Sequence, residues 1–212
     1  MAASFRMGTE VVPFTAALDR VLAADVLSDM DMHPFNKATV DGVACRMADI
    51  DMELAVIETI PAGRMPEKCI AKGECSRIMT GAPVPEGADC IVMVEDTELL
   101  PSGLMKFIGS GTKPNISFRG EDIKKGEAVL QSGKLLSPQD IAVIASADAI
   151  DVTVSRRPLI GIISTGDELV EPQYVPAISQ IRNSNAWQLM AQVSKTGCES
   201  KYYGIVRDDE EE

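Results

Sequence analysis

The segment from Arg77 to Met93 constrains the fold of this chain more than any other part of its sequence. Two short apolar runs flank Thr80, Gly81, two prolines and a second glycine. This pattern predicts a strand, a rigid loop and a return strand, because proline restricts the backbone dihedrals of the loop. Thr80-Gly81 would lie where a hydroxyl and an open backbone can meet a ligand, although a plain turn has the same pattern.

The surrounding region, residues 54–118, alternates short apolar runs with turn clusters. The runs that we predict as strands are Leu54–Ile60, Cys75–Met79, Cys90–Glu95 and Met105–Ile108. Closely spaced strands and turns favour a small all-β domain. Before this region, residues 26–35 are expected to be extended, and Asp41-Gly42 interrupts an apolar run. Taken alone, that dipeptide fits a hairpin turn as well as it fits a functional position.

Two helices are predicted on either side of the β-rich region. Residues 13–25 carry apolar side chains at helical spacing, at Phe14, Leu18, Val21 and Leu22. Ser137-Pro138 begins a second helix, because serine is a favoured N-cap and proline a favoured first helical residue. A strand over residues 151–154 is expected to follow this helix.

The last part of the chain predicts a βαβ unit. Residues 159–163 form a continuous apolar run, which is typical of a strand buried on both faces. A helix over residues 184–195, capped by Gly197, and a strand over residues 200–206 complete the unit. A doubly wound parallel sheet therefore begins here. One such unit does not bury its own faces, so we expect the sequence to be a fragment of a longer protein.

Composition limits the classes of function. The chain has 212 residues, of which 45% are hydrophobic and 25% charged, as in a soluble protein with one large or two smaller domains. A formal net charge of −12 opposes non-specific binding to nucleic acid and to an anionic membrane surface. No apolar run is long enough for a membrane helix, and the start shows no signal-peptide pattern.

Cysteine and histidine usage narrows the expectations further. The five cysteines are odd in number and include no CxxC pair, which favours reduced thiols and a cytoplasmic location. The single histidine, His33, excludes any site that needs two histidines from this chain.

Polar residues stand beside glycine in four places. These places are Asp41-Gly42, Thr80-Gly81, Gly120-Glu121-Asp122 and Gly166-Asp167-Glu168. Ser164 and Thr165 follow a predicted parallel strand and Asp208 follows the next one, at the strand ends where open α/β sheets bind ligands. Each place alone fits a turn or a helix cap. Together they predict a Mg²⁺-dependent site for a phosphate-bearing ligand, with phosphoryl or nucleotidyl chemistry.

Four blocks of sequence resemble one known family. The blocks are Phe35–Gly42, Ile78–Pro85, Arg119–Asp122 and Ser164–Leu169. In order and spacing they resemble the bacterial MoeA-type molybdopterin molybdenumtransferases, which are related to the E domain of gephyrin. The resemblance extends from about Ala17 to Asp209, nearly the whole chain.

The resemblance implies an activity and a set of site residues. Members of the family insert molybdate into adenylylated molybdopterin (molybdopterin-AMP) with Mg²⁺, in molybdenum cofactor biosynthesis, and release AMP. The positions that match the family's active site are Asp41, Thr80, Asp122, Glu168 and Asp208. Ser164, Thr165, Gly166 and Asp167 are expected to bind molybdopterin. Glu168 and Asp41 are the expected Mg²⁺ ligands, and Thr80 is the expected hydrogen-bond donor.

The resemblance also implies a mixed α+β and α/β multidomain fold. We expect an elongated linking domain from residues 1–30 and 123–156, and an inserted small β domain from residues 31–122. Residues 157–212 would begin a doubly wound, molybdopterin-binding α/β domain. The expected partners are a second copy, through the linking domain, and a molybdopterin adenylyltransferase. The cleft would lie between two subunits, and the fragment alone is expected to be inactive.

The sequence departs from the family pattern in two places. The family block Ser-Ala-Met-Asp-Gly-Tyr reads Ala38-Thr39-Val40-Asp41-Gly42-Val43 here, so ligand contacts from the serine and tyrosine side chains are lost. Asn183 stands where aspartate is common. Two alternatives stay open: a non-catalytic dimerising or scaffold module of the same family, and a tungsten-inserting relative.

Overall fold

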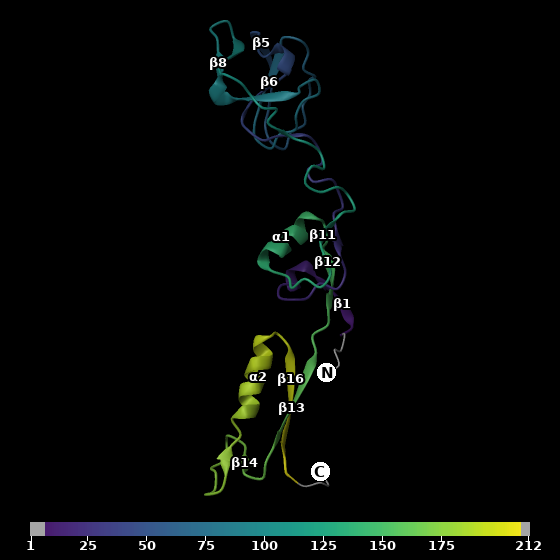
Figure 1. Cartoon of the computed structure of the whole chain (residues 1–212), viewed down its shortest axis with the longest axis vertical. Helices are drawn as coiled ribbons and strands as arrows, with labels where there is room; N and C mark the ends of the chain where they lie inside the picture. Colours follow the sequence, from purple (N-terminus) through teal and green to yellow (C-terminus); the bar gives the residue numbers. More distant parts are fainter. Residues whose placement is uncertain (1–6, 209–212) are drawn as a thin grey trace. The chain divides into compact units, whose positions relative to one another are not determined.

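The computed structural model describes residues 7–208 of the chain. It divides into two compact units, Leu27–Val129 and the pair of segments Met1–Val26 and Leu130–Glu212. Figure 1 shows the elements of each unit. The three-part domain boundaries inferred from the sequence stay a prediction. No helix among the described residues has the length and apolar character needed to cross a membrane.

A six-stranded sheet dominates the unit Leu27–Val129, in the order β7-β4-β6-β5-β9-β8. The strands are β4 (Gly42–Cys45), β5 (Leu54–Ile60), β6 (Glu74–Ile78), β7 (Cys90–Met93), β8 (Thr97–Leu99) and β9 (Leu104–Phe107). The predicted strands of this region are confirmed to within two residues at each end. The strand β4, which the sequence did not predict, is central.

The loop between β6 and β7 does not form a hairpin. The central strand β4 pairs antiparallel with both β6 and β7, so β6 and β7 run in the same direction on either side of it. The prediction of a return strand is therefore wrong, because the chain crosses over β4 before β7 begins. Gly42 permits this close pairing, since a Cβ there would lie 1.9 Å from the carbonyl oxygen of Val92.

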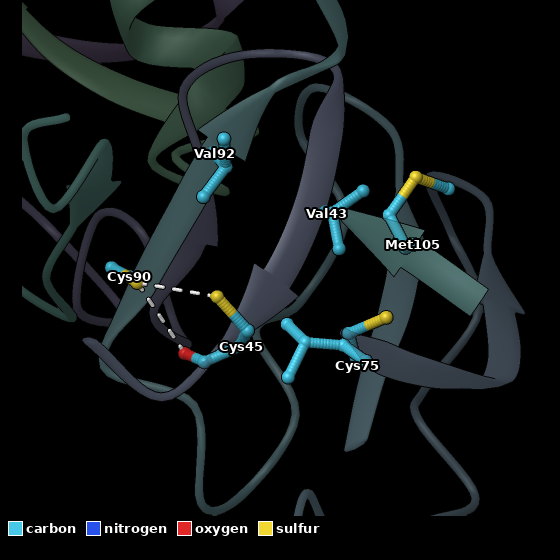
Figure 2. Packing of buried hydrophobic residues seen from close by; sticks show 7 residues of the cluster. Val43, Cys45, Cys75, Cys90, Val92 and Met105 are labelled. Atoms are coloured by element: carbon cyan, nitrogen blue, oxygen red, sulfur yellow. Dashed lines mark hydrogen bonds between the residues drawn. The ribbon is translucent and has the colours of Figure 1, made fainter. Parts of the chain in front are cut away.

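Both faces of this sheet are buried. Along β4, side chains alternate between two clusters, as strand geometry requires. One cluster, which we call the cysteine-rich face, consists of Val43, Cys45, Leu54, Cys75, Cys90, Val92 and Met105 (Figure 2). The other consists of Ala38, Ala44, Ile60, Ile78, Ala82 and Ile91. Small and medium-sized side chains thus fill a core that contains no aromatic residue in either buried set.

Short elements complete this unit. They are β3 (Lys37–Ala38), β10 (Ile116–Ser117), η2 (Met47–Asp49) and η3 (Val94–Asp96), while β2 (Val26–Leu27) and β11 (Ala128–Leu130) each include one residue of the other unit. The pairs are β3 with β10 and β2 with β11. Because β3 pairs with β10 and not with β4, Asp41-Gly42 is not the turn of a hairpin. The expected extended segment 26–35 contains only β2 and an isolated bridge from Met32 to Ile123.

The other unit begins with β1 (Thr9–Pro13), which pairs antiparallel with β12 (Asp151–Ser155). The predicted helix over residues 13–25 is wrong, since only one 3-10 turn, η1 (Phe14–Ala16), forms there. Asp19 adopts a left-handed backbone with φ 58°. Val21 and Leu22 form isolated β-bridges with Leu135 and Val154. Pairing with other segments therefore overrides the helical spacing of the apolar residues.

The helix α1 (Pro138–Ser146) is confirmed, together with its predicted start. The Ser137 hydroxyl accepts from the Asp140 backbone N–H, and the Asp140 side chain accepts from the Ser137 N–H, which completes a capping box.

A βαβ unit follows, as predicted. Strand β13 (Leu159–Thr165) pairs in parallel with β16 (Glu199–Val206), and α2 (Asn185–Lys195) connects them and packs on both. Two more short strands, β14 (Leu169–Val170) and β15 (Ile181–Arg182), lie in the connection. The prediction that residues 159–163 are buried on both faces is wrong for the described structure, because Leu159 and Ile163 are 61% and 58% exposed. The chain as a whole has the mixed α+β character that the sequence predicted.

Candidate functional site

Asp41 and Thr80 form a hydrogen-bonded pair in the β unit. The Thr80 backbone N–H donates to Asp41 Oδ1 over 2.6 Å, and the Thr80 hydroxyl donates to the same oxygen over 2.8 Å. The pairing of β4 with β6 sets Gly42 opposite Ile78, so the residues just beyond these strand positions meet. Two motifs that lie 39 positions apart in the sequence are thereby joined in one site.

The Thr80 donors stabilise the charged form of Asp41. The backbone hydrogen bond and then the hydroxyl hydrogen bond hold the pKa of Asp41 below its ordinary value, against a smaller effect of burial. Asp41 is therefore a carboxylate at neutral pH. Its second oxygen, Oδ2, accepts no hydrogen bond from residues 7–208, so it is available to a ligand or a cation.

The loop that carries Thr80 is held rigidly, as the sequence predicted. Gly81 adopts φ 81°, and its N–H donates to the carbonyl of Ala38, while Ala38 N–H donates back to Ala82. Pro83 and Pro85 are buried. The loop is therefore fastened to β3 directly after the threonine, and Met79 N–H donates to the carbonyl of Ile60 in β5 directly before it, which keeps the Thr80 donors directed at Asp41.

Asp122 belongs to a different cluster of the same unit. Its carboxylate lies 3.5 Å from His33 Nε2, and His33 Nε2 is in contact with Lys37 Nζ. Within the described residues, no hydrogen bond or ion pair joins Asp122 to Asp41 or Thr80. The sequence reasoning missed His33 and Lys37 as its neighbours.

Arg119, from the same sequence block as Asp122, forms an ion pair with Asp31 over 2.7 Å. The backbone N–H of Lys125 and then the Arg119 guanidinium lower the pKa of Asp31. These contacts hold the Arg119–Asp122 block in place, and Asp31 was also missed from the sequence.

In the unit with the βαβ element, Ser164 lies in a polar network. Asn183, which is 2% exposed, donates through Nδ2 to Ser164 Oγ over 2.9 Å and to the Tyr202 hydroxyl over 2.8 Å. Tyr202 donates in turn to Glu171 over 2.7 Å. Burial, then the Glu171 hydrogen bond, raises the pKa of Tyr202. The network fixes the Ser164 side chain beside the start of α2, so the amide at position 183 has a structural role.

The other predicted residues of this unit gather where β13 and β16 end. The Asp208 N–H donates to Asp167 Oδ1 over 3.4 Å, and the Gly166 N–H donates to the backbone carbonyl oxygen of Val206 over 3.3 Å. A Cβ at Gly166 would lie 2.7 Å from Glu168 Oε2, at a backbone φ of 139°. The structure thus brings Gly166, Asp167, Glu168 and Asp208 to the carboxyl ends of two parallel strands.

A hollow of about 230 Å³ adjoins these strand ends. Ser164, Thr165, Asn183 and the first turn of α2 line it. Within residues 7–208, no group of three or more His, Cys, Asp or Glu side chains is arranged to hold a metal ion. Asp41 and Glu168 belong to different units, and their shared Mg²⁺ site stays a prediction.

Comparisons with known proteins agree with the sequence motifs. Residues 1–147 match the family model described as MoeA N-terminal region (domain I and II), and residues 161–212 match the probable molybdopterin binding domain. The molybdopterin molybdenumtransferase of Staphylococcus aureus strain Mu50 is 35% identical over 205 residues, which cover 93% of this chain and 49% of that protein. The enzyme of Bacillus subtilis strain 168 is 35% identical over 212 residues, which cover 95% and 49%.

A solved structure has the same fold. The crystal structure of the molybdopterin biosynthesis moeA protein from Pyrococcus horikoshii OT3 aligns with a TM-score of 0.83 and 36% identity, covering 96% of this chain and 56% of that one. The chain spans about half the length of the curated relatives it matches. Since a family model covers more than half of the sequence, the chain belongs to the MoeA family of molybdenum cofactor biosynthesis proteins.

Proposed function

We propose that this chain supplies part of the active site of a molybdopterin molybdenumtransferase. The reaction is the insertion of molybdate into adenylylated molybdopterin with Mg²⁺, and AMP is released. The observation that carries the proposal is the Asp41–Thr80 pair, in which two family motifs meet with hydrogen bonds of 2.6 and 2.8 Å. Relatives named molybdopterin molybdenumtransferase support the transfer of molybdenum in this proposal.

Asp41 is the reactive group of the β unit in this proposal. The Thr80 donors stabilise its ionised form, and its free Oδ2 faces the ligand as a hydrogen-bond acceptor or a cation ligand. Bound Mg²⁺ supplies charge neutralisation at the phosphoanhydride that is cleaved. Thr80 is a positioning residue, because both of its donors are used on Asp41.

The βαβ element contributes the molybdopterin-binding residues in this proposal. Ser164, Thr165, Gly166 and Asp167 line the end of β13, where parallel sheets bind ligands. Glu168 and Asp208 add carboxylates at the same edge. Asp122 is a further candidate, and a homodimer, a molybdopterin adenylyltransferase partner and a cytoplasmic location belong to the same proposal. A scaffold module without chemistry and a tungstate-specific enzyme are the alternatives.

A chimera with the Bacillus subtilis relative tests the proposal. This chain replaces the half of that enzyme which it matches, and release of AMP and formation of molybdenum cofactor are measured with molybdate and Mg²⁺. We expect turnover by the chimera, and a loss of about 100-fold or more after Asp41→Ala. Asp51→Ala, an exposed aspartate of the same unit, is the matched control and should retain activity.

Three outcomes decide between the alternatives. Full activity of the Asp41→Ala chimera contradicts a catalytic role for Asp41 and favours a scaffold. Absence of turnover in a chimera whose circular dichroism is that of a folded protein contradicts the proposed activity. Turnover with tungstate but not with molybdate identifies the tungsten-inserting alternative.

A further inference from the structure

Arg77 breaks the apolar pattern on the cysteine-rich face of the six-stranded sheet. In β6, Cys75 and Arg77 are two residues apart, so their side chains leave the same face. Cys75 is fully buried in the cluster that Figure 2 shows. Strand register sets Arg77 opposite Val43 of β4 and Thr59 of β5. A guanidinium thus stands at the open edge of an otherwise apolar core.

Arg77 has no ionic partner among residues 7–208. Other arginines of the chain have partners of two kinds: Arg20, Arg46, Arg64 and Arg119 each form an ion pair with a carboxylate, and Arg156, Arg157 and Arg182 donate to backbone carbonyls. Arg77 does not contribute to the lowered pKa of Asp41 either, because the hydrogen bonds from Thr80 account for that lowering. The positive charge is therefore available to an anion from outside the chain.

A cavity of about 440 Å³ opens beside Arg77, on the same unit. Val43, Met79, Leu99 and Met105 give it apolar walls, and Thr59 and Thr97 add hydroxyls. Its volume lies in the range of small-molecule sites, and such sites combine apolar walls with a few polar groups. Asp41 is at the border of the same cavity. Methionine side chains adapt readily to a flat ring.

We propose that this cavity binds a phosphorylated, fused heteroaromatic group. The ring packs against Met79, Leu99 and Met105, and the phosphate accepts hydrogen bonds from the Arg77 guanidinium, whose fork matches phosphate oxygens. The inference rests on the proposed function, since both halves of adenylylated molybdopterin carry this chemistry. It makes Arg77 a substrate-binding residue and places one ring of the substrate next to Asp41.

Binding measured by NMR on the isotopically labelled 212-residue chain tests this site. AMP and neopterin monophosphate are titrated separately, and the tighter ligand identifies which half of the substrate is bound. We expect saturable shifts at Thr59, Leu99 and Met105. Arg77→Ala should weaken binding about tenfold or more, because a hydrogen bond to a charged group is lost. Arg77→Lys should have an intermediate effect.

Two controls isolate the phosphate contact. Lys106→Ala removes the same charge from the exposed side of β9, outside the cavity, and should change affinity less than about twofold. Adenosine, which lacks the phosphate, should bind weakly and equally to the parent chain and to Arg77→Ala. Chemical-shift dispersion verifies that each variant is folded.

The outcomes separate this inference from the proposed function. Absence of binding of both ligands at millimolar concentration, or equal affinity of Arg77→Ala and the parent chain, overturns the Arg77 site. Turnover of the chimera would then still support the molybdenumtransferase. Conversely, Arg77-dependent binding together with an inactive chimera upholds the phosphate site and contradicts only the proposed reaction.

Discussion

The strands β4 and β13 show how neighbours decide what an apolar sequence becomes. All four residues of β4 are buried, whereas of the seven residues of β13 only Ile162 is. β4 has a strand on each edge and a core cluster on each face. β13 has one strand neighbour among the described residues, and α2 packs on it. Apolar composition therefore predicts a strand, while burial depends on the elements that pack around it.

The same contrast applies to the two groups of candidate site residues. Asp41 and Thr80 extend from strands of the six-stranded sheet, and the loop that carries Thr80 is fastened by backbone hydrogen bonds to β3. Ser164 lies in β13 opposite Ile205 of β16, and side-chain hydrogen bonds connect it through Asn183 to Tyr202. The first group therefore extends from strands that are paired along both edges, whereas the second lies at the end of a strand that is paired along one edge among the described residues.

The largest expected effect is the protection of the buried thiols from alkylation in the folded protein. Cys45, Cys75 and Cys90 are buried on the cysteine-rich face of the six-stranded sheet, whereas Cys69 is exposed. Burial raises the pKa of the Cys75 thiol to about 11. Because reaction requires the unit to open, we expect iodoacetamide to alkylate these three thiols about a thousandfold more slowly than in urea. Mass spectrometry of the labelled sites measures this. Rapid native labelling of Cys75 contradicts the closed core.

The second-largest effect is expected on the stability of the β unit when a core side chain is removed. Ile91, in β7, is 0% exposed, and Ile91→Ala should destabilise the β unit by about 2–5 kcal/mol. The change is measured by urea unfolding, with hydrogen exchange of the β4 amides as the probe of the β unit. Trp187, the single tryptophan, lies in α2, so its fluorescence reports the unfolding of the other unit. A shift of the tryptophan transition alone would contradict the assignment of Ile91 to this core.

A pH effect of intermediate size is expected at α1. The Lys134 ion pair and then the Ser137 donors lower the pKa of Asp140 from 3.8 to about 2. Since the folded pKa is depressed, this stabilisation is complete above the unfolded pKa and is lost as the pH falls from 3.8 towards 2. Asp140→Asn should lower the melting temperature by several degrees at neutral pH and flatten its dependence on acid. An unchanged acid dependence contradicts the capping role.

The smallest effect is expected on the open sheet. Ile163 is 58% exposed, so Ile163→Ala should cost less than about 1 kcal/mol, measured by Trp187 fluorescence during urea unfolding. Ile162→Ala, its neighbour at 5% exposed, is the matched comparison and should cost more. Equal costs would show that β13 is covered on both faces in solution.

Local signals in the sequence predicted much of this fold. The start of α1 follows from the Ser137-Pro138 cap, and the β5 boundaries, Leu54–Ile60, match the prediction at both ends. The helix over residues 13–25 failed because long-range bridges of Val21 and Leu22 outweigh local spacing. β4 was missed because it is short and begins at an Asp-Gly pair that resembles a turn.

The candidate site was predictable in composition but not in geometry. Asp41 and Thr80 were selected by their motifs, yet their mutual hydrogen bonds depend on the pairing of β4 with β6, which no local pattern shows. Arg77 was missed, although a charged residue between Cys75 and Met79 on an apolar face was a signal. His33 beside Asp122 could not be predicted, because long-range backbone contacts bring these two segments together.

The titration of Asp41 tests the central claim most directly, namely that the Thr80 donors stabilise this carboxylate and orient it for a ligand. Carbon-detected NMR gives the Asp41 pKa in the folded chain and in an unfolded peptide of the same local sequence. We predict a folded pKa below 3.8, and a rise towards that value in Thr80→Val, which loses the hydroxyl donor. An Asp41 pKa equal in the folded chain, the peptide and Thr80→Val would contradict the account.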